Sequence, residues 1–259
     1  MSKPINPALA FAGALLMAGS HPAIAEGCLF EPQGEGRVAE IIDGRSFRLT
    51  DGREVRLAGI ESAADETTRA NRAAALSALI AGRDVTLLGP DDTPDRYGRQ
   101  TAIVVVGATE APVQALLLRQ GDALVSAEIV DKDCAAELSR AEAEARQAKR
   151  GIWADPAVIK NAESSDDILS GIGRFAVVEG MVLSVRQAGA TTYLNFGRNW
   201  TRGFAATISR RTIAALESAG IAVKSLENRR IRVRGFVEAR SGPRIEVLRA
   251  GQIEILVGK

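Results

Sequence analysis

The sequence has 259 residues, with 33 basic and 32 acidic side chains, a formal net charge of +1 and a single histidine. That histidine, His21, lies in an N-terminal segment that we predict to be removed. The mature chain then has no imidazole, which excludes a Ser-His-Asp triad and most zinc enzymes.

The first 25 residues have the pattern of a secretory signal. Lys3 supplies the positive start, residues 7–19 are apolar, and residues 23–25 read Ala-Ile-Ala, a small-residue cleavage site. The apolar run is too short to span a bilayer. Cys28 follows closely, which leaves a lipoprotein as an alternative, but Glu26 fits a lipid-attachment box poorly. We therefore expect a periplasmic or secreted protein, with cleavage near residue 25.

Export also governs the reading of the two remaining cysteines, Cys28 and Cys134. In an oxidising compartment a pair of cysteines favours a disulfide over a thiol nucleophile. We predict that they are bonded, which would tie the mature N-terminus to the first domain.

Alternation of apolar and polar residues, with turn and helix-end signals, predicts strands interleaved with helices after the leader. The expected strands are 37–42, 48–50, 54–57, 83–88 and 100–106, and the expected helices 67–81, 111–120 and 133–149. Five strands with such helices are the elements of an OB barrel with helical additions.

A second β-rich domain is predicted after a linker. Residues 157–170 are polar and have little to bury, which is a linker composition. Beyond them we expect strands at 176–185, 192–196, 204–208, 231–238 and 244–247, with a helix at 210–219. The predicted organisation is a leader (1–25), an OB domain (26–156), a linker (157–170) and a smaller OB-like barrel (171–259), a mainly β fold with helices.

Three segments of the first domain stand out: the turn Ile42-Asp43-Gly44-Arg45, the segment Arg56-Leu57-Ala58-Gly59-Ile60-Glu61 and the loop Asp95-Arg96-Tyr97-Gly98-Arg99. In this order they resemble the thermonuclease, or staphylococcal nuclease-like, family. Residues 141–153 are similar to the family's terminal helix, so the resemblance covers roughly residues 36–153. The second half is similar to the OB-like domain of bacterial exported members of this family, around Tyr193–Phe196.

The resemblance implies a phosphodiester site with Ca²⁺, a Glu base and two phosphate-binding arginines. Arg56 and Arg99 match the two arginines, and Glu61 and Asp43 occupy metal-binding positions, although Asp43 could equally serve only the turn. Arg45, however, replaces a metal-binding aspartate and offers no oxygen ligand.

The position of the family's general base is also changed. Ala64 stands there, and Asp65 or Glu66 beside it is the alternative base if the chain shifts by a residue or two. With the metal and the base both altered, we expect a degenerate calcium site and little or no cleavage.

Charge is unevenly divided between the two halves of the mature chain. Residues 26–156 carry a net charge of −7, and residues 171–259 carry +9. Arg230, Arg232 and Arg234 alternate with apolar residues and should share one strand face. With Tyr193 and Trp200 they form a predicted surface for single-stranded nucleic acid, although exposed arginines can be merely solubilising.

Three functions remain open from the sequence. The first is an exported homologue that binds nucleic acid or another polyanion without cutting it. The second is a weak or altered metal-dependent phosphodiesterase that uses Arg56, Arg99 and Glu61. The third is an envelope module that binds proteins, because an OB fold does not determine function.

Overall fold

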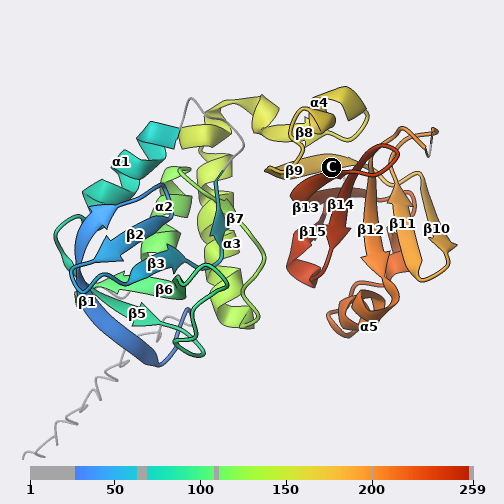
Figure 1. Cartoon of the computed structure of the whole chain (residues 1–259). Coiled ribbons are helices and arrows are strands. Elements are labelled where there is room, and N and C mark those ends of the chain that lie inside the picture. The colour runs from blue at the N-terminus through green and yellow to red at the C-terminus, as the bar shows by residue number, and fades with distance from the viewer. Residues whose placement is uncertain (1–26, 63–68, 108–110, 200, 257–259) are drawn as a thin grey trace, which may run out of the picture.

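The computed structural model describes residues 27–62, 69–107, 111–199 and 201–256, which form two β-rich domains lying side by side (Figure 1). The predicted leader lies outside the described residues. Among the residues that are described, no helix is long and apolar enough to cross a membrane.

The first domain is a closed barrel with strand order β1-β2-β3-β6-β5. Its strands are β1 (Pro32–Ile41), β2 (Ser46–Leu49), β3 (Glu54–Leu57), β5 (Asp84–Leu88) and β6 (Gln100–Val106). Only the pair β3–β6 is parallel among these barrel strands. Along β3, Val55 and Leu57 point into the core and are at most 1% exposed. Because successive side chains of a strand point to opposite faces, Arg56 lies on the outer face of the barrel. The predicted OB barrel is confirmed.

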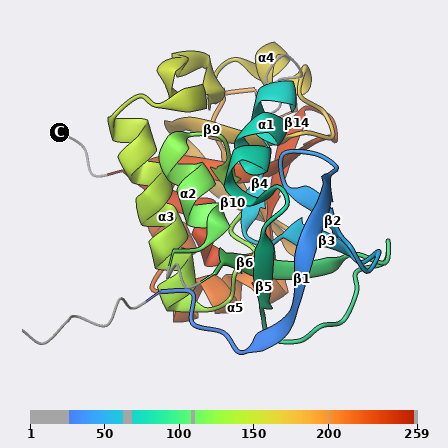
Figure 2. The ribbon, with the colours of Figure 1, turned by 90° about the vertical axis from the view of Figure 1, so that its left-hand side faces the viewer.

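Three helices pack against the barrel, α1 (Arg69–Ile80), α2 (Val113–Gln120) and α3 (Lys132–Gln147). Asp131 is the N-cap of α3, and its carboxylate accepts the backbone N–H of Cys134 at 2.8 Å. Helices α2 and α3 lie next to each other beside the barrel (Figure 2). Two short paired strands, β4 (Ile60–Glu61) and β7 (Leu124–Val125), complete the domain.

The C-terminal ends of α2 and α3 meet through two glycines. Gly121 ends α2 with φ 80°, and Gly151 follows α3 with φ 52°. A Cβ atom at Gly121 would lie 2.2 Å from the carbonyl oxygen of Arg150, and one at Gly151 would lie 2.5 Å from that of Gly121. Only glycine permits both the left-handed backbone and this close approach.

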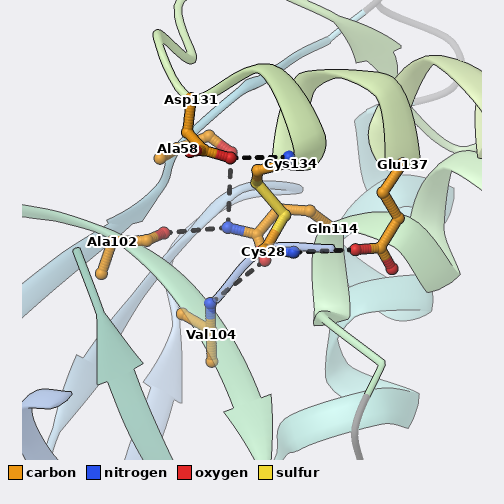
Figure 3. Close-up of a disulfide and its surroundings, with 8 residues drawn as sticks. All are labelled: Cys28, Ala58, Ala102, Val104, Gln114, Asp131, Cys134 and Glu137. Carbon is orange, nitrogen blue, oxygen red and sulfur yellow. Dashed lines mark hydrogen bonds between the residues drawn. A yellow bond between two sulfur atoms is a disulfide. The ribbon is translucent and has the colours of Figure 1, made fainter. Parts of the chain in front are cut away.

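Cys28 and Cys134 form the predicted disulfide (Figure 3). It joins the beginning of the described chain to the first turn of α3, and the backbone N–H of Cys28 donates to Glu137 at 3.0 Å. Nearby, the fully buried side chain of Gln114 accepts from Val104 N and donates to the carbonyls of Ala58 and Ala102. The disulfide prediction is confirmed.

The second domain is a single sheet with strand order β10-β11-β12-β14-β13-β9-β8, in which β15 also pairs with β13. Its elements are β9 (Phe175–Met181), β10 (Ser184–Ala188), β11 (Thr191–Asn195), β12 (Ala205–Ser209), α5 (Arg210–Ser218), β13 (Arg230–Ala239), β14 (Pro243–Val247) and β15 (Ile253–Ile255), with 3₁₀ turns at Val223–Leu226 and Ala250–Gln252. The strand expected at 176–185 is divided into β9 and β10. This is a further β domain, and its OB-like character stays a prediction.

The segment predicted as a linker, residues 157–170, contains regular secondary structure of its own. After two 3₁₀ turns (Gly151–Ala154 and Pro156–Val158), β8 (Ile159–Asn161) pairs in parallel with β9, and α4 (Ser165–Leu169) packs beside it. Ala162 and Ile168 are each 1% exposed within the second core. Strands and helices this short carry too few apolar residues for a periodic signal.

A small hydrophobic core lies between the two domains. Leu124, Ala145 and Trp153 come from the first domain, and Phe175 and Val177 come from β9 of the second. All five are at most 6% exposed. The domains are therefore packed against each other by apolar contact as well as joined by the chain.

Candidate functional site

The turn between β1 and β2 is stabilised by its own aspartate. The carboxylate of Asp43 accepts the backbone N–H of Arg45 at 2.8 Å, and the carbonyl of Arg45 accepts the N–H of Leu57 on β3. Gly44 lies against α1, where a Cβ atom would be 2.7 Å from Cβ of Arg72. The turn is thus fixed to both β3 and α1, with Asp43 acting as a turn-former.

Glu61 is the centre of the candidate site in the barrel domain. Its side chain is 3% exposed, and its Oε1 atom contacts Nη1 of Arg45 and, at 2.7 Å, Nη2 of Arg56. Arg45 also donates to the carbonyl of Ile60 at 3.4 Å. Two guanidinium groups therefore share one carboxylate oxygen.

Burial raises the pKa of the Glu61 carboxyl above its ordinary value. The charges of Arg45 and Arg56, with a hydrogen bond from Arg45, act in the opposite direction. The Glu61 cluster, which we define as Arg45, Arg56 and Glu61, has two cations for one anion.

The described residues do not fit a calcium ion. Calcium requires six to eight oxygen ligands, most of them from carboxylates and carbonyls. Oε1 of Glu61 is already contacted by two cations, and an oxygen of Asp43 accepts from Arg45. Within the described part of the chain, no group of three or more His, Cys, Asp or Glu side chains is arranged to hold a metal. Ala64, Asp65 and Glu66 lie outside the described residues.

Arg99 is held by the loop that precedes β6. Asp95 accepts Nε and Nη2 of Arg99 at 3.0 and 2.8 Å, and its other oxygen accepts the backbone N–H groups of Tyr97 and Arg99. The hydrogen bond from the Arg99 side chain lowers the pKa of Asp95 to about 2, and the same bond raises the pKa of Arg99. The loop is therefore pre-formed around an ion pair.

Arg99 lies on the same side of the barrel as Arg56. In the parallel pair β3–β6, Arg56 lies opposite Thr101, and Arg99 precedes Thr101 by two residues. The charges of Glu54 and Asp43 both act on Arg99. The structure thus brings the two predicted phosphate-binding arginines to one face, together with Asp43.

An aromatic ring is exposed beside Arg99. Tyr97 is 64% exposed, and the guanidinium carbons of Arg96 and Arg99 lie 4.7 and 5.0 Å from its ring centroid. Arg96 also donates to the Tyr97 hydroxyl at 2.6 Å. Tyr97 and Arg96 were not among the site residues predicted from the sequence, although both belong to the motif at residues 95–99.

In the second domain, the predicted arginine stripe of β13 is covered by carboxylates. Arg230 and Arg232 donate to the two oxygens of Glu179 at 2.8 and 2.7 Å, and Arg232 also donates to Glu254 at 3.0 Å. Arg234, 6% exposed, faces the first domain. The three share one face as predicted, but that face is not an open basic surface. Their binding of nucleic acid stays a prediction, with only Arg230 largely exposed.

Of the two aromatic residues predicted to contact nucleic acid in this domain, the structure describes only Tyr193. Tyr193 lies on β11, half-buried, and lines a polar pocket with Arg186 and Arg244. Trp200 lies outside the described residues. Arg186 and Arg244 could not be predicted from the sequence, because neither stands in a basic run or a motif.

Comparison with known protein families identifies the first domain. Residues 54–155 match the family model described as "Staphylococcal nuclease homologue", a stretch that includes Arg56, Glu61 and Arg99. No curated protein matches the chain. This match, together with the closed five-stranded barrel, shows that residues 54–155 form a staphylococcal nuclease-like domain.

Proposed function

We propose that this protein is an exported nuclease homologue that binds nucleic acid through its barrel domain and does not cleave it with calcium. The observation that carries the proposal is the Glu61 cluster, in which Arg45 and Arg56 occupy the same carboxylate oxygen. A cation fixed on this carboxylate takes the place that a metal ion would need. Arg45 supplies positive charge but cannot activate a bound water as a metal does.

The Tyr97 platform, which we define as Tyr97 with Arg96 and Arg99, supports binding of a nucleic acid strand. An exposed aromatic ring stacks on any base, and guanidinium groups pair with phosphates. Arg99 is directed by Asp95 and Arg56 by Glu61, so both guanidinium groups are oriented before a ligand arrives. Orientation in advance lowers the entropic cost of binding.

Export is supported by the disulfide between Cys28 and Cys134. Disulfides persist in oxidising compartments and are rare in the cytosol. The leader predicted at residues 1–25 also supports export. We therefore propose a location in the periplasm or outside the cell.

The test measures binding and cleavage of labelled single-stranded DNA and RNA by the mature protein, with calcium and with chelator. We expect no cleavage in either condition and binding that weakens as salt rises. Tyr97→Ala should weaken binding about tenfold, from the 1–3 kcal/mol that base stacking contributes. Arg140→Ala, an exposed arginine on α3, is the matched control.

Two results would overturn the proposal. Calcium-dependent cleavage that is lost in Arg99→Ala would identify a nuclease, with Asp65 or Glu66 as its base. Failure to bind either strand at low salt would favour a protein-binding role in the cell envelope.

A further inference from the structure

A polar groove runs across the second domain on the sheet face opposite its core. It encloses about 720 Å³, within the range of small-molecule sites. Tyr193, Arg186, Thr207, Arg244 and Glu246 are among its lining residues. Neither the barrel site nor the domain interface uses these side chains.

The groove follows β12 because the residues of that strand are small. Tyr193 on β11 lies opposite Thr207 on β12, which lies opposite Glu246 on β14. One step along, Ala205 lies between Asn195 and Arg244. Long side chains thus flank a central strand of short ones, which leaves a channel between them.

One wall of the groove offers a ring and a cation. Tyr193 is half-buried, and Arg186, its cross-strand partner on β10, is exposed. Arg186 makes no ion pair with any residue that the structure describes. A half-buried aromatic ring beside this exposed guanidinium suits a ligand with a flat ring and a negative charge.

The opposite wall combines a buried cation and carboxylates. Arg244 is 6% exposed and donates to the carbonyls of Gly203 and Pro243 at 2.7 and 2.9 Å. Burial lowers its pKa. Glu238, also on this wall, pairs with Arg240 at 3.0 Å, whereas Glu246 is exposed. The exposed Glu246 carboxylate can accept hydrogen bonds and would repel a phosphate, so the two walls favour different parts of one ligand.

We propose that this groove binds one nucleotide unit of single-stranded nucleic acid. The base stacks on Tyr193, the phosphate pairs with Arg186, and Glu246 accepts a hydrogen bond from an amino group on the base edge. This inference rests on the proposed function, since it adds a second contact point for the same strand. The net charge of +9 on this domain draws the strand toward it.

The experiment measures, by fluorescence anisotropy, the binding of a labelled single-stranded oligonucleotide to the full mature chain. Tyr193→Ala should weaken binding about tenfold, because base stacking contributes about 1–3 kcal/mol. Tyr193→Phe keeps the ring and should bind within about twofold of wild type. Arg186→Ala should lower the slope of log K against log salt by about one. Arg211→Ala, on the exposed side of α5, is the control and should leave both quantities unchanged.

A second probe separates stacking from simple charge. Inorganic polyphosphate has no base, so Tyr193→Ala should leave its binding unchanged while Arg186→Ala weakens it. The proposed nucleotide site is overturned if Tyr193→Ala binds the oligonucleotide as tightly as wild type does. It is also overturned if Tyr193→Ala weakens the binding of polyphosphate as much as that of the oligonucleotide.

Failure of this inference is distinguishable from failure of the proposed function. If Tyr97→Ala weakens oligonucleotide binding and Tyr193→Ala does not, the barrel proposal stands and the groove is overturned. If only Tyr193→Ala weakens it, the groove stands and the barrel domain loses its assigned role. No binding by the wild-type protein at low salt overturns both.

Discussion

Arg234 on β13 and Glu142 on α3 make two parallel hydrogen bonds across the interface between the domains, at 3.0 and 2.9 Å. Their side chains are 7% and 2% exposed. Val125 completes the arrangement, because its carbonyl accepts from Arg234 and its N–H donates to Glu142. A buried charge pair with this many satisfied bonds defines how the two domains are oriented.

Breaking this pair on one side should be costly. Glu142→Gln removes the charge that compensates Arg234, and the free energy of unfolding should fall by about 3–5 kcal/mol. Replacing both, with Glu142→Leu and Arg234→Met, should cost much less, because no buried charge is then left alone. Urea denaturation measures both changes.

An exposed pair in the same stripe supplies the contrast. Arg230 is 60% exposed, and Arg230→Ala, which removes its pair with Glu179, should cost less than about 1 kcal/mol. Equal costs for Arg230→Ala and Glu142→Gln would refute the special role of the interface pair.

The Glu61 cluster can be tested by returning a carboxylate to position 45. Arg45→Asp removes one of the two cations on Glu61 and places an anion beside it. Without calcium the variant should be less stable than wild type, on the order of 3 kcal/mol. Calcium at about one hundred times its Kd should then raise the free energy of unfolding of the variant by about 2.7 kcal/mol. This gain would be measured as a rise in Tm of about 5–10 °C.

Wild type and Arg45→Ala are the controls for calcium, because neither gains an oxygen ligand. Both should keep the same Tm with calcium and with chelator. A calcium-dependent rise in the Tm of wild type would show that the native residues already form a metal site.

The sequence predicted the first domain well because each strand alternates and three motifs occur in order. The contacts of its charged residues could not be predicted in the same way. The period of two placed Arg230, Arg232 and Arg234 on one face, but it says nothing of what covers that face. Their partners Glu179 and Glu142 lie 51 and 92 residues away along the chain. Only the folded arrangement brings such distant charges together.

The Asp95–Arg99 pair should make stability depend on acid pH. The pKa of Asp95 is lowered to about 2 from its ordinary value near 3.8, mainly by the hydrogen bond from Arg99. The folded state therefore binds this proton less readily than the unfolded state, and the pair stabilises the fold fully above about pH 4. That contribution should disappear as the pH falls from about 4 to about 2. Urea denaturation across this pH range should show that the free energy of unfolding falls less for Asp95→Asn than for wild type. If the free energy of unfolding of the two proteins depended on pH in the same way, the prediction would be contradicted.

The disulfide should be a major source of stability for the barrel domain. Cys28 and Cys134 are 106 residues apart in the chain, and a loop of about this length constrains the unfolded state by about 4–5 kcal/mol in the chain-entropy model. The pair Cys28→Ala and Cys134→Ala should lower the free energy of unfolding by 2–5 kcal/mol, a common range for native disulfides. Denaturation of wild type with and without reductant gives the same comparison without mutation, and reductant should leave the double variant unchanged. A reduced wild type as stable as the oxidised form would mean that packing of α3 against the barrel already fixes this part of the chain.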